Sequence, residues 1–171
     1  MTAPFLIEVL GPDHDRTSFS SGVEALDRYF REQVTQDVRR RTTACYVALD
    51  REKAKVAGYY TLAAGGVPLA EMPEALAKKL PRYPFVPVAR VGRLAVDQSY
   101  RGRRLGGGLL WDAGMRALRS ELAVFALVVD AKDEQAASFY QHHGFVAFGS
   151  RPRQFVLPLA KLAEAARGRL P

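Results

Sequence analysis

A glycine- and arginine-rich stretch, SYRGRRLGGGLLWDA at residues 99–113, separates a strand-like segment from a helix-like one. The segment before it, residues 88–97, reads VARVGRLAVD, and the apolar spacing after it predicts a helix over residues 105–120. A strand, a glycine-rich turn and a helix form an anion-binding arrangement, because bare backbone N–H groups and the helix dipole attract negative charge. Since glycine runs also make ordinary turns, a purely structural role stays open. The stretch predicts a phosphate cradle whose ligand must be decided by spacing.

The spacing of the glycines excludes two common nucleotide-binding motifs. No Lys-Ser or Lys-Thr pair closes the loop, which excludes a P-loop. Gly106 and Gly108 lack the third glycine of the dinucleotide-binding fingerprint, because Trp111 stands at that position. The phosphate ligand therefore belongs to a third class.

The rest of the chain alternates between strand and helix patterns. Alternation or apolar runs predict strands at residues 5–10, 45–50, 56–64, 88–97 and 123–131, and short ones near 145–148 and 154–159. Helical spacing predicts helices at residues 20–41 (with Ser21 or Gly22 as the cap), about 73–80 within a long loop 68–87, 105–120, 133–144 and 159–168. We expect one α/β domain with a mixed sheet, spanning residues 1–171.

The bulk composition favours a protein of the cytoplasm with an acidic partner. The formal net charge is +7 and the pI is about 9.8, which suits a nucleic acid, a polyanionic cofactor or an acidic protein, although solubility alone could explain it. A single cysteine, Cys45, excludes an internal disulfide and fits a reducing compartment. We expect no signal peptide, because the start MTAPFLIEVL lacks a basic segment and a long apolar core. We expect no membrane span, because no apolar run reaches about 20 residues.

Three motifs resemble the GNAT acetyltransferases. Residues Arg101–Gly106, RGRRLG, resemble the acyl-CoA pyrophosphate loop Gln/Arg-x-x-Gly-x-Gly/Ala, with Arg104 in place of the middle glycine. An arginine there can donate its backbone N–H if its φ stays negative, and its side chain can reach a phosphate. RLAVD at residues 93–97 resembles the strand whose backbone contacts pantetheine. DEQAASFYQHHGF at residues 133–145 resembles Asn-x-x-Ala-x-x-Phe/Leu-Tyr-x-x-x-Gly-Phe.

The resemblance implies a fold, a cofactor and a set of site residues. The fold is a mixed, mostly antiparallel sheet flanked by helices, with a splay between the central parallel strands at 88–97 and 123–130. Acetyl-CoA is the implied acetyl donor, and no metal is implied. The residues implied to bind it are Leu94, Ala95, Val96, Arg101, Gly102, Arg103, Arg104, Leu105, Gly106, Gly107, Asp133 and Phe139.

Tyr140 occupies the position of the family's tyrosine, whose hydroxyl approaches the acyl-CoA sulfur. The implied role is to hydrogen-bond or protonate the departing thiolate. A tyrosine of pKa about 10 protonates a thiolate of pKa about 8.5 only uphill, by roughly 2 kcal/mol, so stabilisation through a hydrogen bond is the preferred hypothesis. The alternative is that Tyr140 only packs beside Phe139.

Further segments resemble the toxin acetyltransferases of the TacT and AtaT type, a narrower group. They are FSSGVEALDRYF at 19–30, the proline-bearing insertion, GRLAVDQSYRGRRLGGGLLWDA at 92–113 and FVLPLAKL at 155–162. This resemblance implies acetylation of the α-amine of aminoacyl-tRNA, a block of translation, a ribbon-helix-helix antitoxin and a homodimer. Other GNAT enzymes acetylate a small amine or a protein N-terminus, and a catalytically silent CoA-binding partner of a DNA-binding protein is a third hypothesis.

The chemistry of the acceptor agrees with an aminoacyl ester. An α-amine titrates at about 7.7–8.0 against about 10.4 for lysine, and the neighbouring ester lowers it further, so no dedicated base is required. His14, His142 and His143 are not placed as an obvious base. Basic side chains near the mouth of the site are tRNA candidates, each with a solvated surface role as the alternative: Arg93, Arg90, Lys78 and Lys79, and further Arg39–Arg41, Arg82, Arg151 and Arg153.

Overall fold

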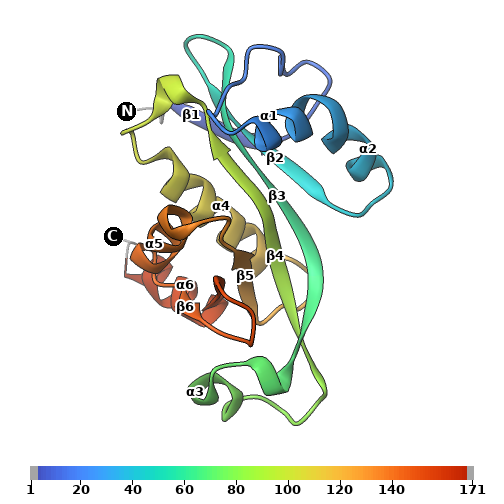
Figure 1. Cartoon of the computed structure of the whole chain (residues 1–171), viewed down its shortest axis with the longest axis vertical. Coiled ribbons are helices and arrows are strands. Elements are labelled where there is room, and N and C mark those ends of the chain that lie inside the picture. The colour runs from blue at the N-terminus through green and yellow to red at the C-terminus, as the bar shows by residue number, and fades with distance from the viewer. Residues whose placement is uncertain (1–3, 169–171) are drawn as a thin grey trace. The chain divides into compact units, whose positions relative to one another are not determined.

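The computed structural model describes residues 4–168, which divide into two compact units (Figure 1). The first unit holds residues 4–63 and 91–113, and the second holds residues 64–90 and 114–168. Strands β3 (Lys55–Pro68) and β4 (Phe85–Val96) and helix α4 (Leu105–Arg119) each contribute residues to both units.

The first unit is built on the strands β1 (Phe5–Val9) and β2 (Ala44–Asp50), together with residues 55–63 of β3 and 91–96 of β4. The strands β1, β2 and β3 pair antiparallel in sequence order. An aromatic cluster covers them, with the Phe30 and Tyr59 rings stacked at 4.2 Å between centroids and Phe19 edge-on to both. The Tyr59 hydroxyl donates to the Leu26 carbonyl oxygen at 2.7 Å and so ties this core to the first helix.

The first helical region begins four residues later than the helix expected at 20–41. It consists of α1 (Glu24–Arg28), a π-helical turn (Tyr29–Gln33) and α2 (Val34–Arg39). The expected caps are wrong as stated, since Val23 precedes the helix and makes no side-chain cap bond. Gly22 has a φ of +90°, which no helix continues through, and the Ser21 hydroxyl instead donates to Asp27 within α1 at 2.6 Å.

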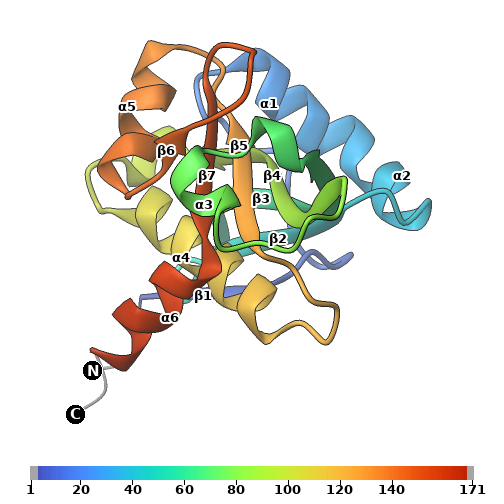
Figure 2. The same cartoon turned by 90° about the horizontal axis from the view of Figure 1, so that it is seen from below.

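The second unit is built on strands β5 (Ala126–Asp130), β7 (Gln154–Pro158) and β6 (Val146–Ala147), in the order β5-β7-β6 with antiparallel pairing. Its apolar core includes Val86, Val88, Val128 and Val156. The helices are α5 (Glu134–His142) and α6 (Leu159–Arg167), and β7 leads directly into α6 (Figure 2).

An excursion between β3 and β4 carries a 3₁₀ turn (Leu69–Glu71) and α3 (Glu74–Ala77) (Figure 1). The long loop expected at 68–87 is shorter, because β3 runs to Pro68 and β4 starts at Phe85. The short helix expected at about 73–80 ends at Ala77. Beyond it the hydrogen bonds tighten to three-residue spacing, from the Leu80 N–H to the Ala77 carbonyl oxygen.

The predicted fold class is confirmed. The strand order is β1-β2-β3-β4-β5-β7-β6, in a mostly antiparallel sheet with one parallel pair and flanking helices. The helices expected at 105–120, 133–144 and 159–168 are present as α4, α5 and α6. The splay between the central strands and the single-domain organisation stay predictions. Within residues 4–168, no helix has the length and apolar character that a bilayer crossing requires.

Candidate active site

The predicted phosphate loop lies between β4 and α4, after a 3₁₀ turn at Gln98–Tyr100. Two of its residues have left-handed backbone, Gly102 with φ +78° and Arg104 with φ +60°. The negative φ under which an arginine at this position was expected to donate its backbone N–H is not met at Arg104. The family's glycine position needs the left-handed conformation here, which costs a side-chain-bearing residue about 1–2 kcal/mol.

Backbone donors are concentrated where α4 begins. The Gly108 N–H donates to the Arg104 carbonyl oxygen at 3.2 Å, so the N–H groups of Leu105, Gly106 and Gly107 precede the first helical bond. These donors carry the positive end of the helix dipole, about half an elementary charge. A Cβ added at Gly102 would meet nothing within 4 Å, so the loop's outer side is open. The start of α4 is therefore suited to bind an anion through main-chain atoms.

The three arginines of the loop differ in what holds their side chains. Arg101 donates from Nη2 to the Ser21 carbonyl oxygen at 2.7 Å. The Arg103 guanidinium lies over the rings of Phe5 and Tyr100, at 5.0 and 5.5 Å from their centroids. Among residues 4–168, nothing hydrogen-bonds, pairs with or stacks on the Arg104 guanidinium, and Arg104 is exposed. Arg104 is thus the loop arginine with a free head group.

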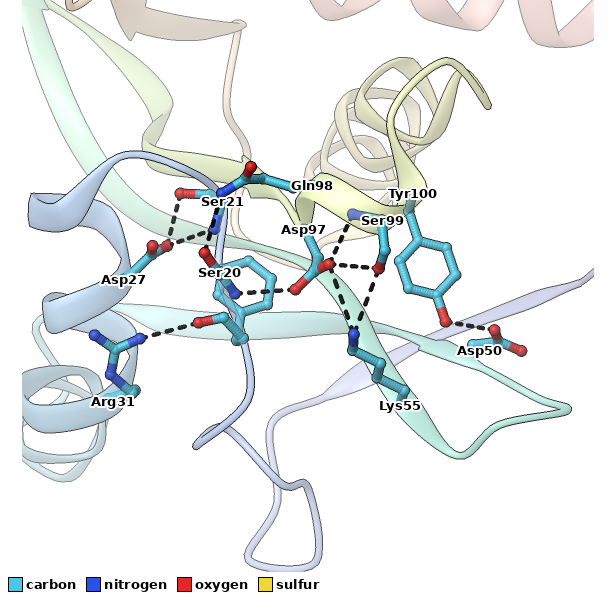
Figure 3. A network of polar contacts seen from close by, with 11 residues as sticks. Ser20, Ser21, Asp27, Arg31, Asp50, Lys55, Asp97, Gln98, Ser99 and Tyr100 are labelled. Carbon is cyan, nitrogen blue, oxygen red and sulfur yellow. Dashed lines mark hydrogen bonds and ion pairs between the residues drawn. The ribbon is translucent and has the colours of Figure 1, made fainter.

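A buried carboxylate, Asp97, organises the turn that precedes the loop (Figure 3). Asp97 is 3% exposed and accepts from the N–H of Ser20 at 2.9 Å and from the N–H and hydroxyl of Ser99 at 2.9 and 2.6 Å. Lys55 Nζ lies 3.7 Å from it. Burial raises the pKa of Asp97, but the hydrogen bonds from Ser99 and Ser20 and the Lys55 charge outweigh burial and lower it. Asp97 is therefore ionised at neutral pH.

Tyr100 ends the same turn and connects it to β2. It is 3% exposed, and its hydroxyl donates to Asp50 Oδ2 at 2.5 Å (Figure 3). Burial and the Asp50 carboxylate raise the pKa of Tyr100 to about 12. The turn before the loop is thus held from β2 and from the Ser20 segment, both within the first unit.

Tyr140 lies on α5 in the second unit, in apolar surroundings. Asp133 caps this helix by accepting from the Ala136 N–H at 2.8 Å. The Tyr140 ring packs edge-on against Phe139 and Phe145, at 5.2 and 5.6 Å between centroids. Tyr140 is 8% exposed, and burial raises its pKa to about 12.

The Tyr140 hydroxyl is available as a hydrogen-bond donor. Among the described residues the Tyr140 hydroxyl has no hydrogen-bond partner. No side-chain polar atom among these residues is both shielded from solvent and without a partner. The hydroxyl oxygen therefore retains accessible surface. A tyrosine with a packed ring and an accessible, unpaired hydroxyl is placed to donate a hydrogen bond to a ligand.

The other predicted cofactor residues divide between the units. Leu94 and Val96 are half-buried at the end of β4, and Ala95 is buried. These three and the loop at 101–107 lie in the first unit, whereas Asp133, Phe139 and Tyr140 lie in the second. Each unit therefore brings together one part of the predicted site.

The predicted tRNA-binding residues have different environments. The Arg93 guanidinium stacks on the Tyr29 ring at 3.5 Å from its centroid, and Arg90 forms a 2.7 Å ion pair with Asp130. Lys78 and Lys79 are exposed on the excursion between β3 and β4. The Lys78–Glu74 pair, 3.8 Å apart and exposed on both sides, is a weak restraint. The two lysines are free to reach a phosphate backbone, and the two arginines are partly engaged.

The histidines and the cysteine have structural environments. His14 Nδ1 accepts from the Gly11 N–H at 2.9 Å and its Nε2 lies 2.7 Å from Glu8. Burial and the neighbouring His142 lower the pKa of His143. Burial raises the pKa of Cys45 to about 12, so its thiol is inert. Across residues 4–168, no group of histidine, cysteine and carboxylate side chains is arranged to hold a metal ion.

Sequence reasoning missed Asp97, Ser20 and Lys55. Their local signal was present, since Asp97 follows the strand and stands two residues before Ser99, a common turn pattern. The contact from Ser20 to Asp97 spans 77 residues, which no local pattern reveals.

Comparisons with known proteins identify the family of this chain. The model of the acetyltransferase (GNAT) domain matches residues 41–147. A tRNA-acetylating toxin of Mycobacterium tuberculosis is 35% identical over 156 residues, covering 90% of this chain and 91% of the relative. A probable toxin TacT of Sinorhizobium fredii is 26% identical over 167 residues, covering 92% of each chain.

The toxin AtaT is similar in structure, with 26% sequence identity. Its complex with acetyl-methionyl-tRNAfMet has a TM-score of 0.82 and covers 95% of this chain and 99% of that one. AtaTR bound with AcCoA has a TM-score of 0.80 and covers 95% and 98%. The expected family resemblance is confirmed: the chain belongs to the GNAT acetyltransferases, is similar to their toxin members, and is an acetyl-CoA-dependent N-acetyltransferase.

Proposed function

We propose that this enzyme transfers the acetyl group of acetyl-CoA to the α-amine of aminoacyl-tRNA and so blocks translation. The observation that carries the proposal is the relative named a tRNA-acetylating toxin, which is 35% identical over nine-tenths of the chain. The AtaT complex with acetyl-methionyl-tRNA supports the same product class. The net charge of +7 suits a polyanionic substrate.

In this proposal the first unit holds the diphosphate of acetyl-CoA. The N–H groups of Leu105, Gly106 and Gly107 donate to it, and the free Arg104 guanidinium adds a charge. The backbone of Leu94–Val96 meets the pantetheine arm. Acetyl-CoA supplies the activated acetyl group, and the chain's own residues bind, orient and discharge it.

Tyr140 acts on the leaving thiolate. With a pKa of about 12, proton transfer to a thiolate of pKa about 8.5 is uphill by about 5 kcal/mol. A hydrogen bond from the hydroxyl to the developing negative charge is therefore the favoured role, worth about 1.5–3 kcal/mol. The amine attacks the thioester carbonyl, the C–S bond breaks, and the amine's surplus proton leaves to solvent or to the thiolate.

An aminoacyl ester suits a site without a histidine base. Its α-amine has a pKa below about 7.7–8.0, so it is largely neutral at pH 7.5, whereas a lysine is not. His14 is already engaged by Glu8 and Gly11. An aminoacyl α-amine is thus an easier acceptor than a lysine side chain, because it needs no dedicated base.

Lys78 and Lys79 contact the tRNA backbone in this proposal, with smaller roles for Arg90 and Arg93. If six or more phosphates are neutralised, tRNA affinity falls about a thousandfold between 50 and 200 mM salt. We further propose a ribbon-helix-helix antitoxin as partner, a homodimer as the assembly and the cytoplasm as the location, where charged tRNA occurs.

The test is incubation of the purified protein with labelled acetyl-CoA and three tRNA preparations: aminoacylated, uncharged, and aminoacylated with a blocked amine. The proposal predicts label on the first alone. Label on a small amine or a protein N-terminus, with none on aminoacyl-tRNA, would contradict the proposal and identify one of these alternatives as the acceptor.

A further inference from the structure

Arg101 occupies the first position of the pyrophosphate-loop motif, yet its guanidinium is bound to a protein atom. Nη2 donates to the Ser21 carbonyl oxygen at 2.7 Å, a contact across 80 residues. The acceptor is a neutral carbonyl oxygen and the donor is charged, so this is a charge-assisted hydrogen bond. The contact fastens the start of the loop to the segment Ser20–Gly22, which precedes α1.

Gly22 leaves space for this guanidinium. A Cβ at Gly22 would lie 2.8 Å from Arg101 Nη2, closer than Cβ atoms approach other atoms, and 3.2 Å from Gln98 Nε2, which is a tight contact. Gly22 also has a φ of +90°, which favours glycine independently. The bare backbone at this position leaves the space that the Arg101 head group occupies.

Other hydrogen bonds bind the same two segments together (Figure 3). The Ser20 N–H donates to Asp97 at 2.9 Å, and the Gln98 N–H donates to the Ser20 carbonyl oxygen at 2.8 Å. Gln98 Nε2 donates to the Ser20 hydroxyl at 3.1 Å. Ser21 in turn donates from its N–H and hydroxyl to Asp27 of α1. The turn before the loop is thus connected through Ser20–Gly22 to α1.

We propose that Arg101 is a positioning residue, which locks the Ser20–Gly22 segment onto the turn before the loop and does not bind the diphosphate. The inference rests on the proposed placement of acetyl-CoA at this loop. It assigns the diphosphate charge contact to Arg104, whose head group is free, because Arg101 is held by Ser21 and Arg103 by Phe5 and Tyr100. The lock preorganises the loop before the cofactor arrives.

The first test needs no ligand. Hydrogen exchange of the Ser20 and Gln98 N–H groups is measured in the free protein for wild type, Arg101→Ala and Arg104→Ala. Loss of the lock should speed their exchange about fivefold in Arg101→Ala, since a hydrogen bond contributes about 1 kcal/mol. Arg104→Ala removes the same charge and should leave both rates unchanged. Unchanged rates in Arg101→Ala would overturn the positioning role.

The second test separates positioning from charge. Acetyl-CoA affinity is measured by calorimetry at low and high salt. Arg101→Ala should weaken binding by about tenfold at both, whereas Arg104→Ala should weaken it mainly at low salt, because a charge contact is screened. In steady state with charged tRNA, Arg101→Ala should raise the KM for acetyl-CoA and leave kcat near wild type. A fall in salt dependence equal to that of Arg104→Ala would make Arg101 a phosphate ligand.

Gly22→Ala provides a variant that leaves the charge unaltered. Its Cβ displaces the Arg101 guanidinium, so positioning predicts the weakened affinity of Arg101→Ala with wild-type salt dependence. A phosphate-binding Arg101, freed from Ser21, would bind acetyl-CoA as well as before or better. Failure of the wild type to bind acetyl-CoA would overturn the proposed cofactor site and leave the exchange result standing, so the two failures are distinguishable.

Discussion

The turn before α4 and the surroundings of Tyr140 are both built from motif residues, but their side chains find different partners. Around Asp97 the side chains hydrogen-bond to one another and to the main chain. The Asp97 carboxylate accepts hydrogen bonds from Ser20 and Ser99 and forms an ion pair with Lys55. Around Tyr140 the contacts are aromatic, and the hydroxyl has no partner among the described residues.

The difference follows from what each region must do. A loop that binds a diphosphate through main-chain N–H groups needs a fixed backbone, so the hydrogen bonds of the preceding turn hold its main chain in place. A hydroxyl that meets a transient thiolate must keep its donor free, so only its ring is fixed by packing. Substitutions in each region test this difference.

The largest effect is expected at the buried carboxylate. Asp97→Ala leaves the Ser20 and Ser99 N–H groups and Lys55 without their partner, and should lower the free energy of unfolding by about 3–5 kcal/mol. Denaturant unfolding measures it. Asp130→Ala, which removes an exposed ion pair with Arg90, is the matched control and should cost about 1 kcal/mol or less. Equal costs would show that the Asp97 hydrogen bonds do not organise the turn.

The same carboxylate predicts a pH dependence. The pKa of Asp97 is lowered from the ordinary 3.8, so the folded state binds fewer protons than the unfolded state at acidic pH. Its stabilising contribution is complete above pH 3.8 and is lost as the pH falls below that value. The difference in stability between wild type and Asp97→Asn should therefore shrink below pH 3.8. A difference constant from pH 7 to 2.5 would contradict the ionised assignment.

A comparable effect, on rate alone, is expected from Tyr140→Phe. Removing the hydrogen bond to the thiolate should lower kcat about 10- to 100-fold, while acetyl-CoA affinity stays within about twofold. Steady-state assays and calorimetry measure the two. Tyr83→Phe, on an exposed tyrosine, is the control and should change neither. Unchanged turnover in Tyr140→Phe would remove the hydroxyl from the mechanism.

Two glycines of α4 sharpen the comparison between tight packing and open space. A Cβ at Gly114 would lie 2.3 Å from Leu162 of α6, whereas one at Gly108 meets nothing within 4 Å. Gly114→Ala should destabilise by about 1–3 kcal/mol through overpacking, and Gly108→Ala should stabilise by about 0.5–1 kcal/mol through helix propensity. Thermal unfolding of both variants measures the two changes in stability. Changes of the same sign would contradict the difference in packing between the two positions.

A small effect is also expected at Arg104, the departure from the family motif. Arg104→Gly relieves a φ of +60° and should raise stability by about 1 kcal/mol. It should also weaken acetyl-CoA binding a few-fold, since the free guanidinium is lost. Thermal unfolding and calorimetry together report the two opposite signs. A variant that is more stable and binds as tightly as wild type would leave Arg104 without a role at the phosphates.

Local signals explain which parts of the fold the sequence could predict. The helix expected at 133–144 was placed correctly, because Asp133 caps α5 and Gly144, whose φ is +92°, follows its end. The start of α1 was misplaced because Gly22, with a φ of +90°, turns the chain and Ser21 hydrogen-bonds to Asp27, so the helix begins only after these residues. The π-helical turn at Tyr29–Gln33 has no signature in the apolar spacing.

The candidate site was predictable only where a motif is contiguous. The loop and the tyrosine were recognised from adjacent residues, but the partners of Arg101 and Asp97 lie 80 and 77 residues away. The left-handed Arg104 was missed because an arginine gives no local sign of that backbone conformation. Long-range hydrogen bonds and unusual φ angles are therefore what the structure adds.

The most direct test of the account is a crystal structure of the protein with acetyl-CoA. The account predicts the diphosphate on the N–H groups of residues 105–107 with Arg104 beside it, and the thioester sulfur within hydrogen-bond distance of the Tyr140 hydroxyl. A diphosphate bound elsewhere, or a Tyr140 hydroxyl directed away from the sulfur, would contradict it.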